Sequence, residues 1–162
     1  LKKKGFSSDF ITSGLENSLM QLISEQGHKH HKIEKKENYN NYFQNQDYFY
    51  LDNIFDAEKT IQIIKEEKQP SSIIIDHYGI DSEWHKKLQS YCKKLIVIDD
   101  IANRKFECDV LMNPTYDFNK SSYDNLVSES CLKLIGAEYA LIRPEFLEIR
   151  PKSKKRDRLI KI

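Results

Sequence analysis

Three polar side chains follow a run of isoleucines near the middle of the chain. The run covers residues 73–75, and Asp76, His77 and Tyr78 come directly after it. A continuous β-branched run is typical of a central strand in a parallel sheet, covered on both faces. Because ligands in open α/β sheets bind outside the carboxyl ends of the strands, these side chains are candidates for proton transfer or for binding polar groups. In the alternative interpretation, Asp76 and the glycine at 79 only shape a turn.

Two further acids follow the next apolar run along the chain. Residues 95–98 are all aliphatic, and Asp99 and Asp100 come next. A helix is predicted from Asp81 to about residue 94, and two strands joined by a helix form a right-handed unit with both carboxyl ends at one edge. We therefore expect Asp99 and Asp100 to share a rim with His77 and to bind hydroxyl or amide groups. The alternative is that they only cap or shape the loop.

Two more candidate side chains lie further along the chain. Asn113 ends a short strand predicted from residue 109, and a proline then turns the chain. A strand at 132–136 ends in a glycine, which lets backbone or ligand approach closely. Arg143 follows and precedes a helix with proline in its first turn. Its forked guanidinium suits a phosphate or a carboxylate, and an ion pair with a residue such as Glu145 is an equal alternative.

The elements that must position these residues alternate between strand and helix patterns. Residues 6–12 read as a strand, and 15–27 carry an apolar stripe at helical spacing. The stretch 34–50 is polar and aromatic and predicts no firm element. Asp52 or Asp56 is expected to cap the next helix.

The helix between the two central strands is predicted to begin at Asp81, and residues 80–82 are expected to supply its cap. Trp84 is one of the residues that this helix is expected to turn toward the sheet. His85 lies well past the strand end, so it is expected at the surface.

The bulk composition limits the class of protein. The chain has 162 residues with 39% hydrophobic and 31% charged residues, which fits a globular domain of ordinary size. A net charge of +1 argues against a dedicated nucleic-acid-binding domain, because neutralising phosphates requires a marked basic excess. No stretch approaches the length of an apolar membrane helix, and no signal peptide is recognisable. A cytoplasmic protein is therefore expected.

The possible metal ligands do not form a convincing set. The histidines between residues 28 and 31 lie close together, but no cysteine or carboxylate partners accompany them, so a solvated loop or a short edge strand is favoured. The cysteines are odd in number, widely spaced and without a Cys-x-x-Cys pair, which indicates free thiols: Cys92, Cys108 and Cys131. We predict no metal and no cofactor.

The two ends of the chain have the pattern of a fragment. Lys2 to Lys4 with the following glycine resemble the last turn of a helix that is otherwise missing. Residues 1–150 are expected to form a Rossmann-like domain that lacks its first strand and helix. The charged stretch 151–158 is expected to be an interdomain linker, and 159–162 the start of a second domain.

Four separate motifs resemble one known family in order and spacing. They are Asp76 to Ile80, Ile98 to Asp100, Cys108 to Asn113, and Gly136 to Phe146. They look like the amino-terminal half of the UDP-2,4-diacetamido-2,4,6-trideoxy-β-L-altropyranose hydrolases of pseudaminic acid biosynthesis. The resemblance implies a two-domain fold of the glycosyltransferase B class, with the active site between two Rossmann-like halves. It also implies that water attacks the anomeric carbon and UDP leaves with inversion, without a metal.

The resemblance also assigns expected roles, and it has gaps. His77 and Tyr78 are expected to be catalytic residues in the cleft. Five further residues are expected to bind the UDP-linked sugar: Asp76, Asp99, Asp100, Asn113 and Arg143. The family's general base lies in a Gly-x-Gly-His loop, which occurs nowhere in this sequence, so the fragment itself is expected to be inactive. Three alternatives remain open. They are a non-catalytic carbohydrate or nucleotide-sugar module, a related enzyme for another amino sugar such as a glycosyltransferase, and a receiver-like domain that binds a divalent cation at its aspartates.

Overall fold

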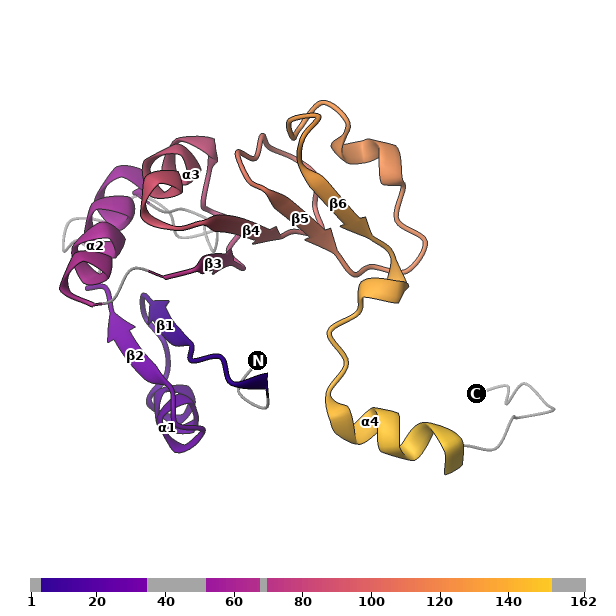
Figure 1. Cartoon of the computed structure of the whole chain (residues 1–162), viewed down its shortest axis with the longest axis horizontal. Helices are drawn as coiled ribbons and strands as arrows, with labels where there is room; N and C mark the ends of the chain where they lie inside the picture. The colour runs from indigo at the N-terminus through magenta and orange to yellow at the C-terminus, as the bar shows by residue number, and fades with distance from the viewer. Residues whose placement is uncertain (1–3, 35–51, 68–69, 153–162) are drawn as a thin grey trace, which may run out of the picture.

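The computed structural model describes residues 4–34, 52–67 and 70–152. Most of the predicted polar stretch 34–50 and of the predicted linker 151–158 lies outside these residues, as do residues 159–162. Strands and α-helices alternate as far as β4, and β5 and β6 then follow with no α-helix between them: β1 (Asp9–Thr12), α1 (Asn17–Glu25), β2 (Lys29–Lys32), α2 (Asn53–Glu66), β3 (Ser72–Ile75), α3 (Ser82–Leu88), β4 (Lys94–Ile98), β5 (Val110–Asn113), β6 (Leu132–Ile135) and α4 (Pro144–Ile149). Figure 1 shows this path.

All strand pairs among the described residues are parallel, so the chain has the predicted α/β class. The larger sheet has the order β3-β4-β5-β6, and β1 pairs with β2 in a separate two-stranded sheet. The registers are regular, with Ile75 opposite Val97 and Val97 opposite Leu111. Because neighbouring parallel strands run in one direction, β3 to β6 present their carboxyl ends along a common edge.

One face of the larger sheet carries the hydrophobic core. Helices α2 and α3 lie over this face (Figure 1), and their side chains pack in one cluster with the strands. Trp84 joins the two helices, because its indole N–H donates a 2.8 Å hydrogen bond to the buried Asp56 carboxylate. The cap of α2 is Asp52, which accepts from the Phe55 amide at 3.0 Å. Of the two predicted alternatives, Asp52 therefore caps α2, and Asp56 anchors α3.

The other face of the same sheet is apolar and only partly covered. The register places two rows of side chains on it: Ile74, Ile96, Val110 and Leu132 in one row, and Ile98, Met112 and Leu134 in the next. Ile74 is 51% exposed and Leu132 is 57% exposed. The expectation that the strand at 73–75 is covered on both faces is therefore wrong for the described residues. Helix α1 contacts chiefly β2, and α4 contacts chiefly the turn that follows it.

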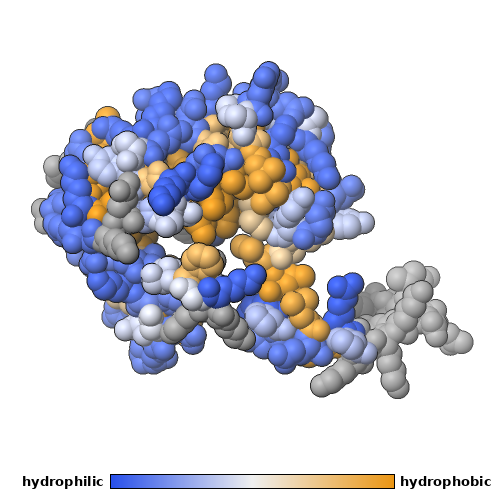
Figure 2. All heavy atoms as spheres, in the orientation of Figure 1, coloured by the Kyte–Doolittle hydropathy of each residue, from blue (hydrophilic) through white to orange (hydrophobic). Residues whose placement is uncertain are grey.

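Helix α4 lies apart from the larger sheet, and in the view of Figure 1 β1 and β2 lie between that sheet and α1. Figure 2 shows hydrophobic residues around a hollow in the middle of the view. Both helices carry exposed apolar side chains: Leu19 and Leu22 in α1, and Phe146, Leu147 and Ile149 in α4. No helix in the described part of the chain is long and apolar enough to cross a bilayer.

The prediction that His85 lies at the surface is wrong. Its side chain is fully buried, and its ring stacks on Phe106 with centroids 6.1 Å apart and planes 23° from parallel. The Glu107 amide donates to Nδ1 of His85 at 3.2 Å. The chain between β4 and β5 folds back over α3 and covers this side chain, which helical spacing within α3 alone does not reveal.

The burial of His85 leads to a prediction about acid stability. Burial lowers the pKa of His85 to about 4, so the folded protein holds this ring neutral where the unfolded chain already protonates it. Stability is therefore lost as the pH falls from about 6.5 to about 4, by up to about 3 kcal/mol. We expect His85→Gln, which keeps an acceptor and does not titrate, to unfold with a shallower dependence on pH in this window. Urea unfolding at pH 7, 6, 5 and 4.5 measures the difference, and parallel curves for the two proteins would contradict it.

Gly136 directly follows β6 and has a backbone conformation that favours glycine. Its φ is +126°, its amide donates to the Asn113 carbonyl at 2.8 Å, and an added Cβ would collide with the Glu138 carboxylate. We expect Gly136→Ala to lower the free energy of unfolding by about 1–3 kcal/mol, measured by urea titration. The double variant Gly136→Ala/Glu138→Ala removes the collision and keeps the backbone strain. It should retain most of the loss, and full recovery would show that the collision alone was responsible.

Candidate functional site

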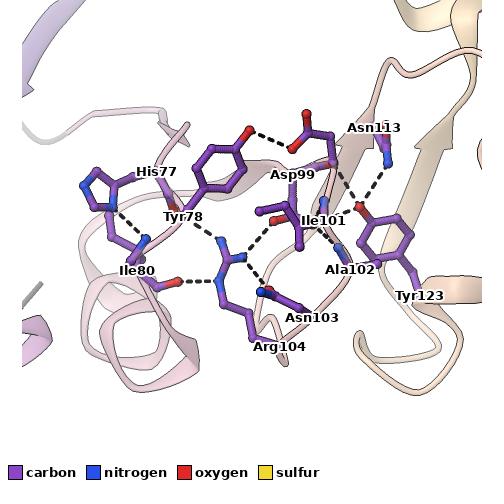
Figure 3. A network of polar contacts seen from close by, with 12 residues as sticks. His77, Tyr78, Ile80, Asp99, Ile101, Ala102, Asn103, Arg104, Asn113 and Tyr123 are labelled. Atoms are coloured by element: carbon purple, nitrogen blue, oxygen red, sulfur yellow. Dashed lines mark hydrogen bonds and ion pairs between the residues drawn. The ribbon is translucent and has the colours of Figure 1, made fainter. Parts of the chain in front are cut away.

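The carboxyl ends of β3, β4 and β5 bring most of the predicted site residues to one edge of the sheet. Figure 3 shows His77 and Tyr78 after β3, Asp99 after β4, and Asn113 at the end of β5. We call this edge the rim. The grouping agrees with the topology expected from the sequence. The side chains differ sharply in exposure, and this difference decides what each can do.

Asp99 is buried, and both of its oxygens are fully engaged. Its side chain has no exposed surface, and Oδ1 accepts from Nη1 of Arg104 at 2.8 Å. Oδ2 accepts from the amides of Ile101 at 3.1 Å and Ala102 at 2.8 Å. The Tyr123 hydroxyl lies 2.9 Å from the same oxygen. A carboxylate surrounded in this way holds the loop after β4 in place, which is an internal structural task.

Arg104 connects the loops that follow β3 and β4. In addition to its ion pair with Asp99, its Nε donates to the Ile80 carbonyl at 2.8 Å and its Nη2 to the His77 carbonyl at 3.2 Å. The guanidinium also lies over the Phe106 ring, 4.6 Å from its centroid. Arg104 therefore fixes the backbone that carries His77. Nothing in the local sequence pattern distinguishes this arginine from a solvated one, and it was not among the predicted site residues.

Asn113 and Tyr123 extend this network toward β5. Asn113 is fully buried, its Nδ2 donates to the Tyr123 hydroxyl at 3.1 Å, and its Oδ1 accepts from the Thr115 amide at 2.9 Å. Burial and the Asp99 carboxylate raise the pKa of Tyr123. The hydroxyl thus stays protonated and links Asn113 to Asp99. Tyr123 was also missed by the sequence analysis, because it contacts residue 99 across 24 positions of chain.

The open part of the rim consists of His77, Tyr78 and Asp100. The Gly79 amide donates to Nδ1 of His77 at 3.0 Å, so the neutral ring carries its proton on Nε2. Burial lowers the pKa of His77, although the Asp56 carboxylate acts in the opposite direction, and the neutral form is favoured. The Tyr78 hydroxyl donates to Oδ1 of Asp100 at 2.7 Å, and this bond raises the pKa of Tyr78.

These three side chains offer a defined set of hydrogen-bonding groups to a ligand. Tyr78 is 39% exposed, Asp100 is exposed and His77 is half-buried. Asp76, at the end of β3, is also exposed. The set combines an imidazole N–H donor, a phenol and carboxylates. Such groups are suited to sugar hydroxyl and acetamido groups, and the imidazole N–H is also suited to a phosphate oxygen.

Arg143 does not belong to the network at the rim. It lies in the exposed segment before α4, where its guanidinium is 5.2 Å from the centroid of the Phe146 ring. Within the part of the chain that the structure describes, Arg143 does not form an ion pair with Glu145.

The described residues contain no group of three or more side chains suited to hold a metal ion. The histidines before and within β2 pair with the β1 segment, where Nδ1 of His28 lies 2.9 Å from the Ser8 hydroxyl and Nε2 of His30 lies 2.8 Å from the Thr12 hydroxyl. They therefore belong to a short strand and the turn before it, one of the two predicted alternatives.

A hollow of about 400 Å³ lies beside β6, and its lining includes none of the rim residues His77, Tyr78 and Asp100. Two lysines in its lining already pair with carboxylates, Lys133 with Asp124 and Lys120 with Glu138. The hollow therefore has no unpaired lysine to select a charged ligand, and we place the candidate site at the rim.

Comparison with known proteins gives one partial likeness. The fold and the rim define an α/β protein with parallel sheets, compatible with a Rossmann-like arrangement, and no family model matches the chain. A stretch of 90 residues is 42% identical to the UDP-2,4-diacetamido-2,4,6-trideoxy-β-L-altropyranose hydrolase of Campylobacter jejuni. The match covers 54% of this chain and 32% of that protein. The chain thus matches about a third of the length of this relative, and the likeness is one of partial resemblance to its family.

Proposed function

We propose that this chain forms part of the substrate cleft of a UDP-sugar hydrolase. The substrate is a UDP-linked 2,4-diacetamido-2,4,6-trideoxyhexose, and the reaction belongs to nonulosonic acid biosynthesis of the pseudaminic type. The observation that carries the proposal is the open set of His77, Tyr78 and Asp100 at the carboxyl ends of β3 and β4, where α/β sheets bind ligands. The 42% identity to a hydrolase of this name supports the choice of substrate.

In this proposal the rim holds the sugar and the leaving group during attack by water. Water bonds to the anomeric carbon, the C–O bond breaks, and UDP departs. His77 donates from Nε2 to the sugar or to a phosphate oxygen, because its Nδ1 is already occupied by the Gly79 amide. Tyr78 and Asp100 bind hydroxyl or acetamido groups as a pair, and Asp76 lies within the same exposed surface. Fixing the reactants in this way contributes by orientation.

The buried residues of the rim act indirectly in this proposal. Asp99 and Asn113 have their polar atoms engaged within the protein, so we assign them the task of holding the loops that carry the open residues. Arg143 lies outside the rim network, and we propose that it binds a phosphate or a carboxylate group at the edge of the cleft.

The proposal requires a base to deprotonate water, and His77 is poorly suited to this task because its acceptor nitrogen is engaged. The resemblance implies a base in a Gly-x-Gly-His loop, which these 162 residues do not contain. We therefore propose that residues 1–150 form one domain of a two-domain cleft. The base and the second nucleotide-binding half belong to parts of a longer protein, joined through residues 151–158.

The test is an assay of the complete protein that contains this chain. It should release UDP from the UDP-linked diacetamido sugar, measured by a coupled UDP assay. The resemblance implies metal-independent chemistry, so the release should persist in EDTA. Loss of release in EDTA that Mg²⁺ restores would contradict the proposed mechanism, and absence of release from several UDP-linked diacetamido sugars would contradict the proposed activity.

A second candidate is a module that binds a nucleotide sugar without cleaving it. A complete protein that lacks a Gly-x-Gly-His loop would favour this candidate. Calorimetry of the complete protein with the UDP-linked sugar separates the two candidates, since the module binds the sugar with no UDP release, whereas the hydrolase releases UDP. Tyr78→Phe serves as the control for specific binding at the rim, because it removes only the hydroxyl that contacts Asp100.

A further inference from the structure

Two buried cysteines lie in contact at the end of the sheet opposite the rim. The sulfur atoms of Cys108 and Cys131 are 3.7 Å apart, and the two residues are only 7% and 6% exposed. Cys108 precedes β5 and Cys131 precedes β6, so both lie at the amino ends of their strands. The proposed hydrolase activity makes no use of them.

The contact makes the two thiols unequal. Either thiol can donate to the other sulfur, and when Cys108 donates, this hydrogen bond lowers the pKa of Cys131 against the opposing effect of burial. The same hydrogen bond, together with burial, raises the pKa of Cys108. In that arrangement Cys131 is the sulfur that forms a thiolate, and the thiolate is the form that reacts with oxidants.

We propose that Cys108 and Cys131 form a reversible disulfide when the folded protein meets hydrogen peroxide. The Cys131 thiolate attacks one peroxide oxygen, the O–O bond breaks, and hydroxide leaves with the other oxygen, which produces a sulfenic acid. The Cys108 sulfur then attacks the sulfenic sulfur, the S–O bond breaks, and the Cys108 proton leaves with the hydroxyl group as water. Each cysteine sulfur is oxidised by one electron, and the peroxide is reduced to water and hydroxide. A dithiol reverses the reaction by exchange.

The local structure favours this reaction on two grounds. A disulfide has sulfurs about 2.0 Å apart, so the pair must approach by about 1.7 Å, which is within the range of small side-chain rotations. An exposed turn at residues 128–130 lies directly before Cys131 and is closed by a 3.0 Å hydrogen bond from the Cys131 amide to the Ser128 carbonyl. β6 is also the last strand of its sheet. Opening of this turn admits a molecule as small as peroxide.

The crosslink closes a loop that carries part of the rim network. Asn113 and Tyr123 both lie between the two cysteines in sequence, and they hold Asp99. The new bond forms at the amino ends of the strands, and the rim lies at their carboxyl ends. Oxidation should therefore leave the open residues of the rim unchanged.

Peptide mapping of the oxidised wild-type protein tests the proposal. The folded protein is treated with hydrogen peroxide, denatured, alkylated with N-ethylmaleimide and digested for mass spectrometry. Among the three cysteines of these 162 residues, only Cys92 should remain alkylated, and a linked Cys108–Cys131 peptide should be present. Dithiothreitol should restore all three. Three unreacted thiols, a crosslink through Cys92, or a sulfinic acid at Cys131 beside a free Cys108 would each overturn the proposal.

Two single variants make the test specific to the pair. Cys92 donates to the Leu88 carbonyl at 3.8 Å within its own helical region, so Cys92→Ser should still form the crosslink. Cys108→Ser removes the resolving thiol, and Cys131 should then accumulate the sulfinic acid. Protein oxidised in urea gives a reference without the folded contact, and it should lose the preference for the Cys108–Cys131 pair. Because the mapping itself uses the wild-type chain, the result does not depend on whether a variant folds.

Discussion

Asp99→Ala is expected to lower the free energy of unfolding by about 3–5 kcal/mol, the usual cost of removing one partner of a buried ion pair. The substitution leaves the Arg104 guanidinium without its carboxylate, 2.8 Å away in the wild type. It also leaves the amides of Ile101 and Ala102 and the Tyr123 hydroxyl without their acceptor. Urea unfolding followed by circular dichroism measures the loss.

Two neighbouring substitutions serve as controls for this expectation. Asp99→Asn keeps one acceptor oxygen and the side-chain shape, so it should lose less stability than Asp99→Ala. Asp100→Asn changes the adjacent, exposed carboxylate, and it should alter stability by no more than about 0.5 kcal/mol. If Asp99→Ala and Asp100→Asn gave equal small losses, the assignment of Asp99 as the anchor of the loop would be wrong.

His77→Ala is expected to reduce UDP release by the complete protein by about 10²–10³-fold, the range found when one hydrogen-bond donor to a developing charge is removed. The physical reason is the fixed tautomer, because the Gly79 amide at Nδ1 leaves an N–H at Nε2 for the sugar or the departing phosphate. The loss should fall mainly on kcat if the donor serves the transition state. Steady-state kinetics with the UDP-linked sugar provides the measurement.

The matched control is a histidine that lies away from the rim. His31 in β2 contacts the Asp9 carboxylate at 3.4 Å, so His31→Ala removes an imidazole without touching the site, and it should leave turnover within about twofold of wild type. Circular dichroism of both variants checks that they fold. Unchanged turnover in His77→Ala, with substrate saturating, would remove His77 from the proposed cleft.

The strands and their direction could be predicted from the sequence because the signal is local and strong. The runs at 73–75 and 95–98 are continuously aliphatic, and they form β3 and β4 with the expected parallel pairing. The predicted strand at 6–12 is shorter in the structure, where only Asp9–Thr12 pairs with β2. Its first residues lack a hydrogen-bonded neighbour strand, which local propensity does not report.

The internal arrangement of the rim could not be predicted, because it depends on contacts between distant residues. Asp99 and Asp100 look equivalent in the sequence, yet one is buried under Arg104 and Tyr123 and the other is exposed. The same limit explains the error at His85, whose cover comes from the chain between β4 and β5. Patterns within one element give the direction of a side chain but not what packs over it.

The partly covered apolar face of β3 to β6 has a practical consequence for anyone who produces this chain by itself. Two rows of apolar side chains, including Ile74 at 51% exposure, form a partly exposed apolar surface of the kind that promotes aggregation. Within the described residues β3 is an edge strand of this sheet, and an edge strand can pair with another chain. Work at low protein concentration is therefore the route to monodisperse material.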